Sequence, residues 1–441
     1  MDKRVYKWEK AFSHTALRLA VPVVIQSLVA ASMHIVDNVM IGQLGEIELA
    51  AVTQANRISF LLQITMFGVV SGLAVFTAQY WGVRDIKGIR STLGLGMITA
   101  LCVAIIFALA AILFPERIMR ILIQELPAIH AGSQYLRIIG FAYIIEALSA
   151  VYAAVLKSTE QVKLPMFATS VAIISNTILN YGFIFGNFGF PRLGVRGAAI
   201  ATLIGVSFEL IMLVVFSYKN SFATAARLSE LKPKSKAEVK KFFRVVFPTM
   251  INECLWSLGM VMYSVAYGMM GASTVAAVSI FNNVEQLGGV VLRGGTHACS
   301  VMTGMSIGAG HLDEAQLTAK RMIFAHAVAG CVIGAILVFI SRPIASVFNV
   351  ASETADNAVM IIIIYAITMF IAAMASAVIV GILRAGGDVK YAMILDTAPV
   401  WLIGIPLVFI FGPGQGWPVY LVFLLTRIEE TVKVAIGIWR I

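Results

Sequence analysis

Residues 22–52, PVVIQSLVAASMHIVDNVMIGQLGEIELAAV, are matched 226 positions later by residues 248–278, PTMINECLWSLGMVMYSVAYGMMGASTVAAV. Each stretch begins at a proline, runs through apolar residues to a Gly-x-x-Gly turn and ends in Ala-Ala-Val. The pairing continues without a gap to positions 82 and 308, and its identities include prolines and glycines, where the backbone is most restricted. The chain therefore carries two copies of one structural unit.

The composition is that of a membrane protein. Apolar residues make up 59% of the 441 residues and charged residues only 13%, whereas soluble domains carry about 25% charged residues. A spanning helix needs about 20 apolar residues and satisfies its own backbone hydrogen bonds. The long apolar runs predict such helices and argue against a soluble protein. The net charge is +10, and the positively charged residues lie between the apolar runs, so they indicate membrane topology rather than nucleic-acid binding.

Twelve apolar runs predict an all-α membrane protein with twelve transmembrane helices in two six-helix bundles. Because each half has an even number of helices, the halves share one orientation and form a parallel repeat, as in some secondary transporters. We expect an N-terminal lobe at 1–218, a basic linker at 219–242 and a C-terminal lobe at 243–441. The expected spans are 14–42, 49–81, 91–114, 130–156, 163–187, 195–218, 243–270, 275–308, 317–342, 356–383, 389–411 and 417–439.

Lysine and arginine indicate the orientation. They gather before the first run, in the central linker and in further loops of the same side, which the positive-inside rule places in the cytoplasm. We therefore expect a multi-pass protein of the cytoplasmic (inner) membrane with both termini in the cytoplasm. The sequence has no Walker A motif, HExxH motif or nucleophile elbow, and its 4 cysteines lack CxxC spacing. Neither an enzyme activity nor a cofactor is expected.

Asp37 is the first candidate functional residue. A charge at the bilayer centre costs at least about 2.5–3.5 kcal/mol, so acids inside the apolar runs point to function. Asp37 pairs with Tyr263 across the repeat, and an acid required only by the scaffold would be expected in both halves. Asp37 is therefore a candidate carrier of a proton or another cation. A helix-end residue bonded to a neighbour is the alternative.

Asn176 and Asn180 form a second polar feature. They lie four residues apart, on one face of the helix expected at 163–187, and their counterparts in the second half are Leu402 and Pro406. Their amide oxygens, together with Asp37, can coordinate a small hard cation such as Na⁺. Hydrogen bonds between helices explain the same spacing equally well.

Glu253 is the candidate acid of the second half. It follows Pro248, a residue that kinks a helix and can open a polar pocket, and it shares a helix face with Trp256 and Met260. A carboxylate beside an aromatic ring and a flexible thioether suits an organic cation. Ordinary packing or lipid contact is the alternative for the aromatic ring and the thioether.

Three stretches resemble motifs of the multidrug and toxic compound extrusion (MATE) family, and the resemblance covers nearly the whole chain. They are Pro22 to Val52, Leu193 to Thr202 and Leu383 to Asp388. The resemblance implies an antiporter that alternates between outward and inward states. Its implied cation site comprises Asp37, Asn176, Asn180 and Thr202. Many members carry Asp where this chain has Asn180, which leaves the coupling ion open. In one branch of the family, the acid of the seventh helix matches Glu253. The acid of the tenth helix in that branch falls near Ala373, so this part of the branch's C-terminal site is absent here.

The expected function is export of organic cations across the cytoplasmic membrane, driven by a proton or sodium gradient. Asp37 would be the coupling acid, and Glu253 would attract the cationic substrate or share in coupling. The alternative is a lipid-linked precursor flippase with a cationic cavity, for which Arg57 and Arg293 are the candidate residues. The expected partners are small organic molecules and the lipid bilayer, and we expect a monomer.

Overall fold

The computed structural model describes residues 3–346, 348 and 350–441, and their side chains except those of 3–11 and 33–35. The described residues form helices and connecting turns, with no β-strand among them. Eleven of the described helices are long and apolar enough to cross a membrane. One further long helix, α14 (Val419–Arg440), occupies the span expected at 417–439 and carries several charged residues in its middle. The expected all-helical membrane fold is confirmed.

Contacts divide the chain into two compact units. The first-half unit comprises Ile25–Met250, and the second-half unit comprises Ile251–Ile441 together with Met1–Val24. Both boundaries lie inside continuous helices, α1 (Lys3–Gly42) and α8 (Lys236–Met269). The lobes expected from the sequence instead place all of α1 in the first half, and place α8 in the second half from position 243 onward, with its first residues in the expected linker.

The boundaries also obey the internal repeat. One lies two residues after Pro22 of α1 and the other two residues after Pro248 of α8, and these prolines are repeat partners. A proline inside a helix removes a backbone hydrogen bond and weakens the helix at that point. The two proline-containing helices therefore divide at equivalent positions because the same breaker occupies both.

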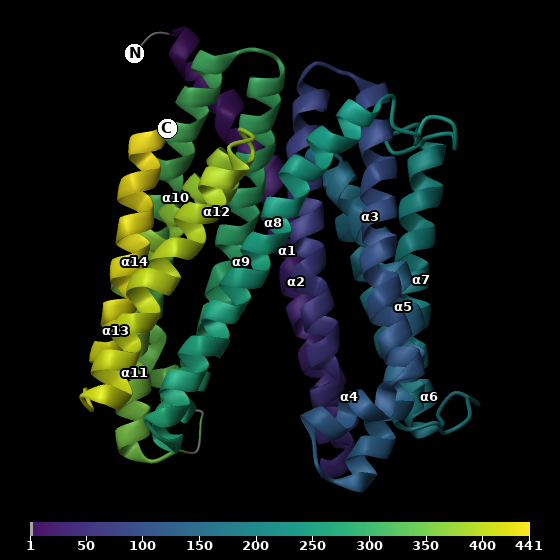
Figure 1. Ribbon diagram of the computed structural model, residues 1–441, viewed down its shortest axis with the longest axis vertical. Coiled ribbons are helices and arrows are strands. Elements are labelled where there is room, and N and C mark those ends of the chain that lie inside the picture. The colour runs from purple at the N-terminus through teal and green to yellow at the C-terminus, as the bar shows by residue number, and fades with distance from the viewer. Residues whose placement is uncertain (1–2, 347, 349) are drawn as a thin grey trace. The chain divides into compact units, whose positions relative to one another are not determined.

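The first-half unit is a helical bundle in which α2, α3, α5, α6 and α7 run side by side (Figure 1). Its helices after α1 are α2 (Glu46–Gly82), α3 (Ile86–Leu113), α4 (Pro115–Leu122), α5 (Leu126–Ser158), α6 (Lys163–Phe185) and α7 (Val195–Lys219). Its core includes Leu73, Leu136 and Tyr143, which are fully buried. The short helix α4 lies outside the expected spans and begins at Pro115, since proline is well suited to the first helical position.

The second-half unit repeats the bundle with wider helical turns. It contains α8, α9 (Ala272–Gly308), α10 (Leu312–Ser346), α11 (Ser352–Ser376), η1 (Ala377–Arg384), α12 (Val389–Pro399), η2 (Val400–Gly404), α13 (Ile405–Phe409), η3 (Ile410–Gly414) and α14. The three η segments are π-helical. Pro399, Pro406 and Pro413 lie in or beside the last two, where each removes an intrahelical hydrogen bond. Such π turns are often found at functional sites.

Two glycines give the repeat its equivalent turns. Gly45, between α1 and α2, has φ +148°, and its repeat partner Gly271, between α8 and α9, has φ +113°. Residues with a side chain rarely adopt such angles, so glycine is required at both positions. The Gly-x-x-Gly signal in the sequence therefore marks the turn that closes the first helix pair of each half.

The connection between the halves packs on the first-half unit. Residues 220–235 join α7 to α8, and Arg90 of α3 donates to Glu230 at 2.7 Å and to the Ala223 carbonyl at 3.3 Å. Gly94 of α3 faces the Leu231 backbone so closely that a side chain there would overlap it. The segment expected as a linker is thus anchored to α3 along part of its length.

Candidate functional site

A buried polar cluster joins α1, α6 and α7 within the first-half unit. The Asn180 amide donates to Asp37 Oδ1 at 2.7 Å and to Asn176 Oδ1 at 3.0 Å. The Asn176 amide lies 3.3 Å from the Thr202 hydroxyl, which donates to the Ala198 carbonyl of its own helix. The structure thus brings together all four residues that the sequence motifs suggest for the cation site.

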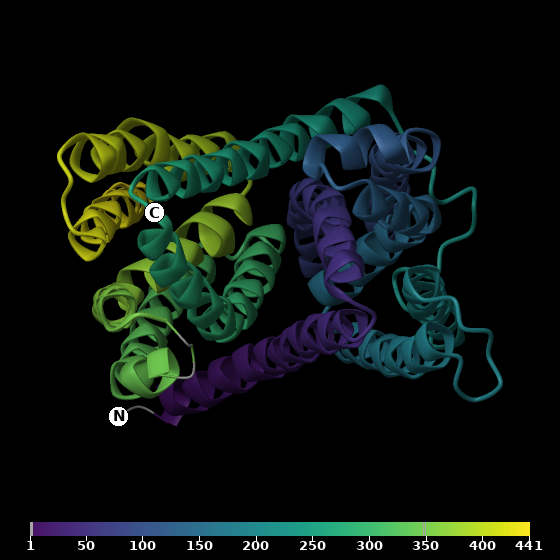
Figure 2. The same ribbon diagram turned by 90° about the horizontal axis from the view of Figure 1, so that it is seen from below.

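Helix geometry explains why these residues meet. Asn176 and Asn180 lie one turn apart on α6, so both amides face the same neighbours. Gly205 of α7 permits close packing, because a Cβ at this position would lie 3.2 Å from the Ala172 carbonyl and from Asn176 Cβ. Figure 2 shows the C-terminal part of α1 ending beside the later helices of this unit. These contacts place the Asp37 carboxylate against the two amides.

Hydrogen bonding favours the reversed orientation of the Asn176 amide, in which nitrogen and oxygen exchange places. In the reversed orientation, its nitrogen donates to Asp37 Oδ1 at 3.2 Å and its oxygen accepts from the Thr202 hydroxyl at 3.3 Å. That orientation gives up the hydrogen bond from Asn180.

The donor set of this cluster suits a proton or a small hard cation. It offers carboxylate, amide and hydroxyl oxygens, the ligands that hard cations prefer. Asn176 and Asn180 are each 1% exposed, and Asn180 Oδ1 is a buried oxygen with no hydrogen-bond partner among the described residues. No group of three or more His, Cys, Asp or Glu side chains with metal-binding geometry occurs among those residues.

Glu253 lies in a buried charge network of the second-half unit. Arg384, at the end of η1, approaches Glu253 Oε1 to 2.7 Å and Asp396 Oδ2 to 3.5 Å. Asn252 bridges the two acids by donating to Glu253 at 3.3 Å and to Asp396 at 2.9 Å. Lys433 lies 3.6 Å from Asp396 Oδ1.

Helix α14 extends this network. Lys433 lies 3.1 Å from Glu430 and 3.9 Å from Glu429, and Glu429 accepts a hydrogen bond from the Tyr263 hydroxyl of α8. Arg384 and Lys433 are each only 2% exposed. Four acids and two basic residues thus share one buried region, and the charges of α14 are satisfied by partners within the protein.

The three second-half residues expected to act on a substrate differ in their surroundings. The Trp256 ring is exposed, and Met260 packs against the apolar core of this unit. Glu253 itself is held by Arg384 rather than free.

Sequence reasoning missed the basic half of the network. Arg384 was read only as part of a motif, and Lys433 was not singled out although it lies inside an apolar run. A lysine in such a run is costly unless it is paired, so it was the available signal for a buried acid nearby. Pairing it with Asp396, however, requires the packing of α14 against α12, which no local pattern reveals.

A family model described as MatE matches residues 22–182 and 248–410. The chain belongs to the MatE family. The two matched regions begin at Pro22 and Pro248, the first residues of the internal repeat. The resemblance to MATE transporters drawn from the motifs is therefore confirmed, and the fold and the family together make the chain a multi-pass membrane protein.

Named relatives match nearly the whole chain. The probable multidrug resistance protein NorM of Thermotoga maritima is 24% identical over 401 residues, which cover 89% of this chain and 84% of the relative. The uncharacterized transporter YisQ of Bacillus subtilis is 24% identical over 437 residues, which cover 96% and 92% of the two chains. These similarities point to a transporter rather than an enzyme.

Solved structures share the fold. A structure described as MATE in the bent conformation superposes with a TM-score of 0.88 and 18% identity, covering 97% of this chain and 94% of the other. A transporter of the MOP superfamily from Pyrococcus furiosus, whose binding pocket is described as having reversed polarity, superposes with a TM-score of 0.85 and 18% identity, covering 96% and 94%. Identity at this level shows a common architecture of MatE proteins.

Proposed function

We propose that this protein is a secondary active antiporter that exports organic cations across the cytoplasmic membrane by alternating access, driven by a proton or sodium gradient. Membership of the MatE family and relatives described as probable multidrug resistance proteins support the substrate class. We further propose that both termini lie in the cytoplasm and that the transporter acts as a monomer.

The observation that carries this proposal is the cluster of Asp37, Asn176, Asn180 and Thr202. A half-buried carboxylate that faces amide and hydroxyl groups, as Asp37 does, can take up and release a cation as its surroundings change. A transporter must bind its coupling cation tightly enough to load and weakly enough to release it. One acid among neutral ligands meets this requirement, because a greater negative charge would hold the cation more strongly.

We assign Glu253 to coupling rather than to direct attraction of a substrate. Its ion pair with Arg384 would have to open before the carboxylate could contact a cationic molecule. A proton or cation arriving at the network could open that pair by changing its charge balance. Trp256 and Met260 remain candidates for apolar contact with a substrate as it passes.

Transport by purified protein in proteoliposomes tests the function. Vesicles are loaded with a fluorescent organic cation, and a proton gradient or a sodium gradient is imposed in parallel experiments. We expect dye movement that depends on at least one gradient and is absent from protein-free vesicles. If neither gradient moves the dye, the antiporter proposal loses its main support.

The same vesicles test the flippase alternative. Arg57 and Arg293, the residues considered for a cationic cavity, are both exposed on their helices, and Arg293 donates to the Gln286 carbonyl at 3.1 Å. A flippase would translocate a labelled polyprenyl phosphate without moving the dye. Dye movement alone favours export of organic cations.

A further inference from the structure

A second polar layer crosses the same three helices as the candidate cation site. Gln26 of α1 donates to the Thr169 hydroxyl of α6 at 2.7 Å, and that hydroxyl donates to Glu209 Oε1 of α7 at 2.6 Å. Each layer contains one residue of α1, at least one of α6 and one of α7, and each contains one carboxylate. The α1–α6–α7 interface therefore has an acid at two levels, Asp37 and Glu209.

The spacing aligns the two layers along the bundle. Gln26 precedes Asp37 by eleven residues, Thr169 precedes Asn176 by seven, and Glu209 follows Thr202 by seven. Seven residues are about two helical turns, a rise of roughly 10 Å, and eleven are about three turns, a rise of roughly 16 Å. On each helix the two layers therefore lie on the same face, with a longer separation on α1. Helix α7 runs opposite to α1 and α6, so all three offsets point toward the end of the unit from which residues 220–235 leave.

The residues between the two layers are small, or they form hydrogen bonds within their own helix. Gly205 of α7 packs against Ala172 of α6 between the two levels. The nearby hydroxyls of Ser170 and Ser207 donate to carbonyls of their own helices, those of Met166 and Leu203. A cation that leaves Asp37 toward Glu209 therefore meets no competing acid on α6 or α7 before it reaches the second layer.

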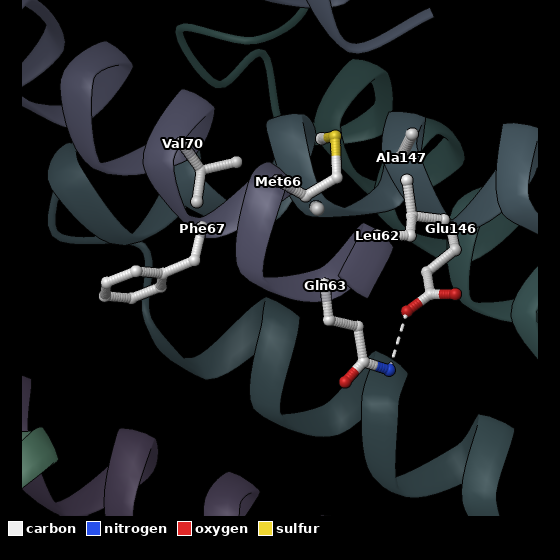
Figure 3. Close-up of a pocket in the computed structure, with 8 residues that line it drawn as sticks. Leu62, Gln63, Met66, Phe67, Val70, Glu146 and Ala147 are labelled. Atoms are coloured by element: carbon white, nitrogen blue, oxygen red, sulfur yellow. Dashed lines mark hydrogen bonds between the residues drawn. The ribbon is translucent and has the colours of Figure 1, made fainter. Parts of the chain in front are cut away.

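The charges that face Glu209 come from α5. Lys157 of this helix attracts Glu209 and Glu146 repels it, and Lys157 does not approach Glu209 within the 4.0 Å of an ion pair. The Glu146 carboxylate accepts from Gln63 of α2 at 3.2 Å at the rim of a cavity of about 170 Å³ (Figure 3). Apart from Gln63 and Glu146, the cavity is lined by apolar residues of α2 and α5.

We propose that Glu209 is a second proton-accepting residue of the transport cycle, which receives the proton that leaves Asp37 and passes it to the end of the unit that carries residues 220–235. This inference rests on the proposed antiport in its proton-driven form. The O–H bond at the Asp37 carboxyl breaks as the proton leaves, and an O–H bond forms at a Glu209 oxygen as the proton arrives. The positive charge of Lys157 disfavours a sodium ion at this level but does not prevent proton uptake.

Thr169 connects the protonation state to the position of α1. The ionised Glu209 carboxylate accepts from the Thr169 hydroxyl, which frees the hydroxyl oxygen to accept from Gln26. A protonated Glu209 can itself donate, so the hydroxyl loses a charge-assisted acceptor and its bond with Gln26 is weakened. Proton arrival at Glu209 therefore loosens α1 from α6 at the second layer.

Two assays of the reconstituted protein test this assignment. Glu209→Gln keeps the shape and hydrogen-bonding reach of the side chain but does not titrate. Dye transport driven by an imposed proton gradient should fall about tenfold or more, whereas exchange of labelled for unlabelled dye, which requires no net proton movement, should remain. Glu209→Asp, which still titrates, should restore part of the gradient-driven rate and shift its pH profile.

Glu146→Gln is the matched control, because it removes the neighbouring charge from the same region without touching the Gln26–Thr169–Glu209 chain. We expect its gradient-driven rate to stay near that of the wild type. Equal loss in Glu146→Gln and Glu209→Gln would overturn the assignment, as would a Glu209→Gln protein with unchanged rate and pH profile. Loss of dye exchange as well would indicate a merely structural residue and likewise overturn it. Absence of dye movement under both a proton and a sodium gradient in the wild type would instead refute the antiport proposal. Wild-type movement under the sodium gradient alone would overturn only the Glu209 assignment.

Discussion

The Arg384 guanidinium lies 2.7 Å from the Glu253 carboxylate, and both groups are buried in the second-half unit. The acid that the sequence offered as an attraction for cationic molecules is therefore already neutralised by a cation of the protein. Arg384 reaches it from the last residue of a π-helical segment, where the wider turn changes the direction of the side chains. Any function of Glu253 has to begin with this pair.

Breaking the pair from one side should be strongly destabilising. Arg384→Met leaves Glu253 buried beside Asp396 without its closest positive partner, which typically costs about 3–5 kcal/mol. We expect a marked fall in the thermal unfolding midpoint of the detergent-solubilised protein. The double variant Arg384→Met with Glu253→Gln should regain part of the loss, since no unpaired charge remains at that point. A double variant no more stable than the single one would contradict this account.

Asp37→Asn should abolish gradient-driven transport while leaving membrane insertion intact. The substitution keeps the shape of the side chain and its ability to accept from Asn180, but it removes the charge that binds a proton or cation. Dye efflux from proteoliposomes measures the effect, and a monodisperse profile in size-exclusion chromatography checks folding. Asp313→Asn, at an exposed acid in the first turn of α10, is the control. Full activity of Asp37→Asn would remove this residue from the mechanism.

Asn180→Asp should strengthen the binding of sodium. It places a second carboxylate at the oxygen that lacks a partner, beside Asp37. Because affinity for hard cations rises with the number of charged ligands, we expect the apparent sodium affinity to increase by about tenfold. Fluorescence or calorimetric titration with NaCl against a choline control measures it. Asn283→Asp, on an exposed face of α9, should leave the titration unchanged.

Gly404→Ala should disturb the part of the charge network that contains Tyr263 and Glu429. A Cβ at this position overlaps the Tyr263 hydroxyl and Glu429 Oε2, which are hydrogen-bonded to each other. One of the two groups must move, and overpacking of this kind costs about 1–3 kcal/mol. The thermal midpoint should fall accordingly. Gly268→Ala in α8, where no atom lies within 4 Å of the added Cβ, should be neutral or slightly stabilising.

The attachment of residues 220–235 to α3 should weaken in acid. The pKa of Glu230 lies below its ordinary value of 4.5, first because the Arg227 backbone N–H donates to it and also because Arg90 does. A lowered pKa means that the contribution of Glu230 is complete above about 4.5 and is lost as the pH falls through the folded-state value.

Hydrogen–deuterium exchange of this segment measures the attachment. At neutral pH, Glu230→Gln should exchange faster than the wild type in the segment around residues 223–233. The two proteins should converge once the pH has fallen below the lowered folded-state pKa of Glu230, because the wild-type carboxyl is then also uncharged. Comparison at each pH removes the intrinsic pH dependence of exchange. A difference that persists unchanged into acid would rule out Glu230 as its source.

Much of the candidate cation site was accessible from sequence because its residues follow local rules. The spacing of four between Asn176 and Asn180 indicates a shared helix face. Asp37 is an acid inside an apolar run, and its repeat partner is not an acid. The chain through Gln26, Thr169 and Glu209 gives a weaker signal, since glutamine and threonine are common in membrane helices. Their connection becomes visible only when three helices are packed together.

The sequence by itself determined the class, the number of long helices, the duplication and the turns of this protein, because apolar run length, proline and glycine act on the backbone close to where they occur. Only the tertiary structure decided the partners of the buried charges. Arg384 and Glu253 are 131 positions apart, and Lys433 and Asp396 belong to different helices. Pairing between distant residues depends on how the helix faces are rotated against one another, and many side chains fix that rotation together.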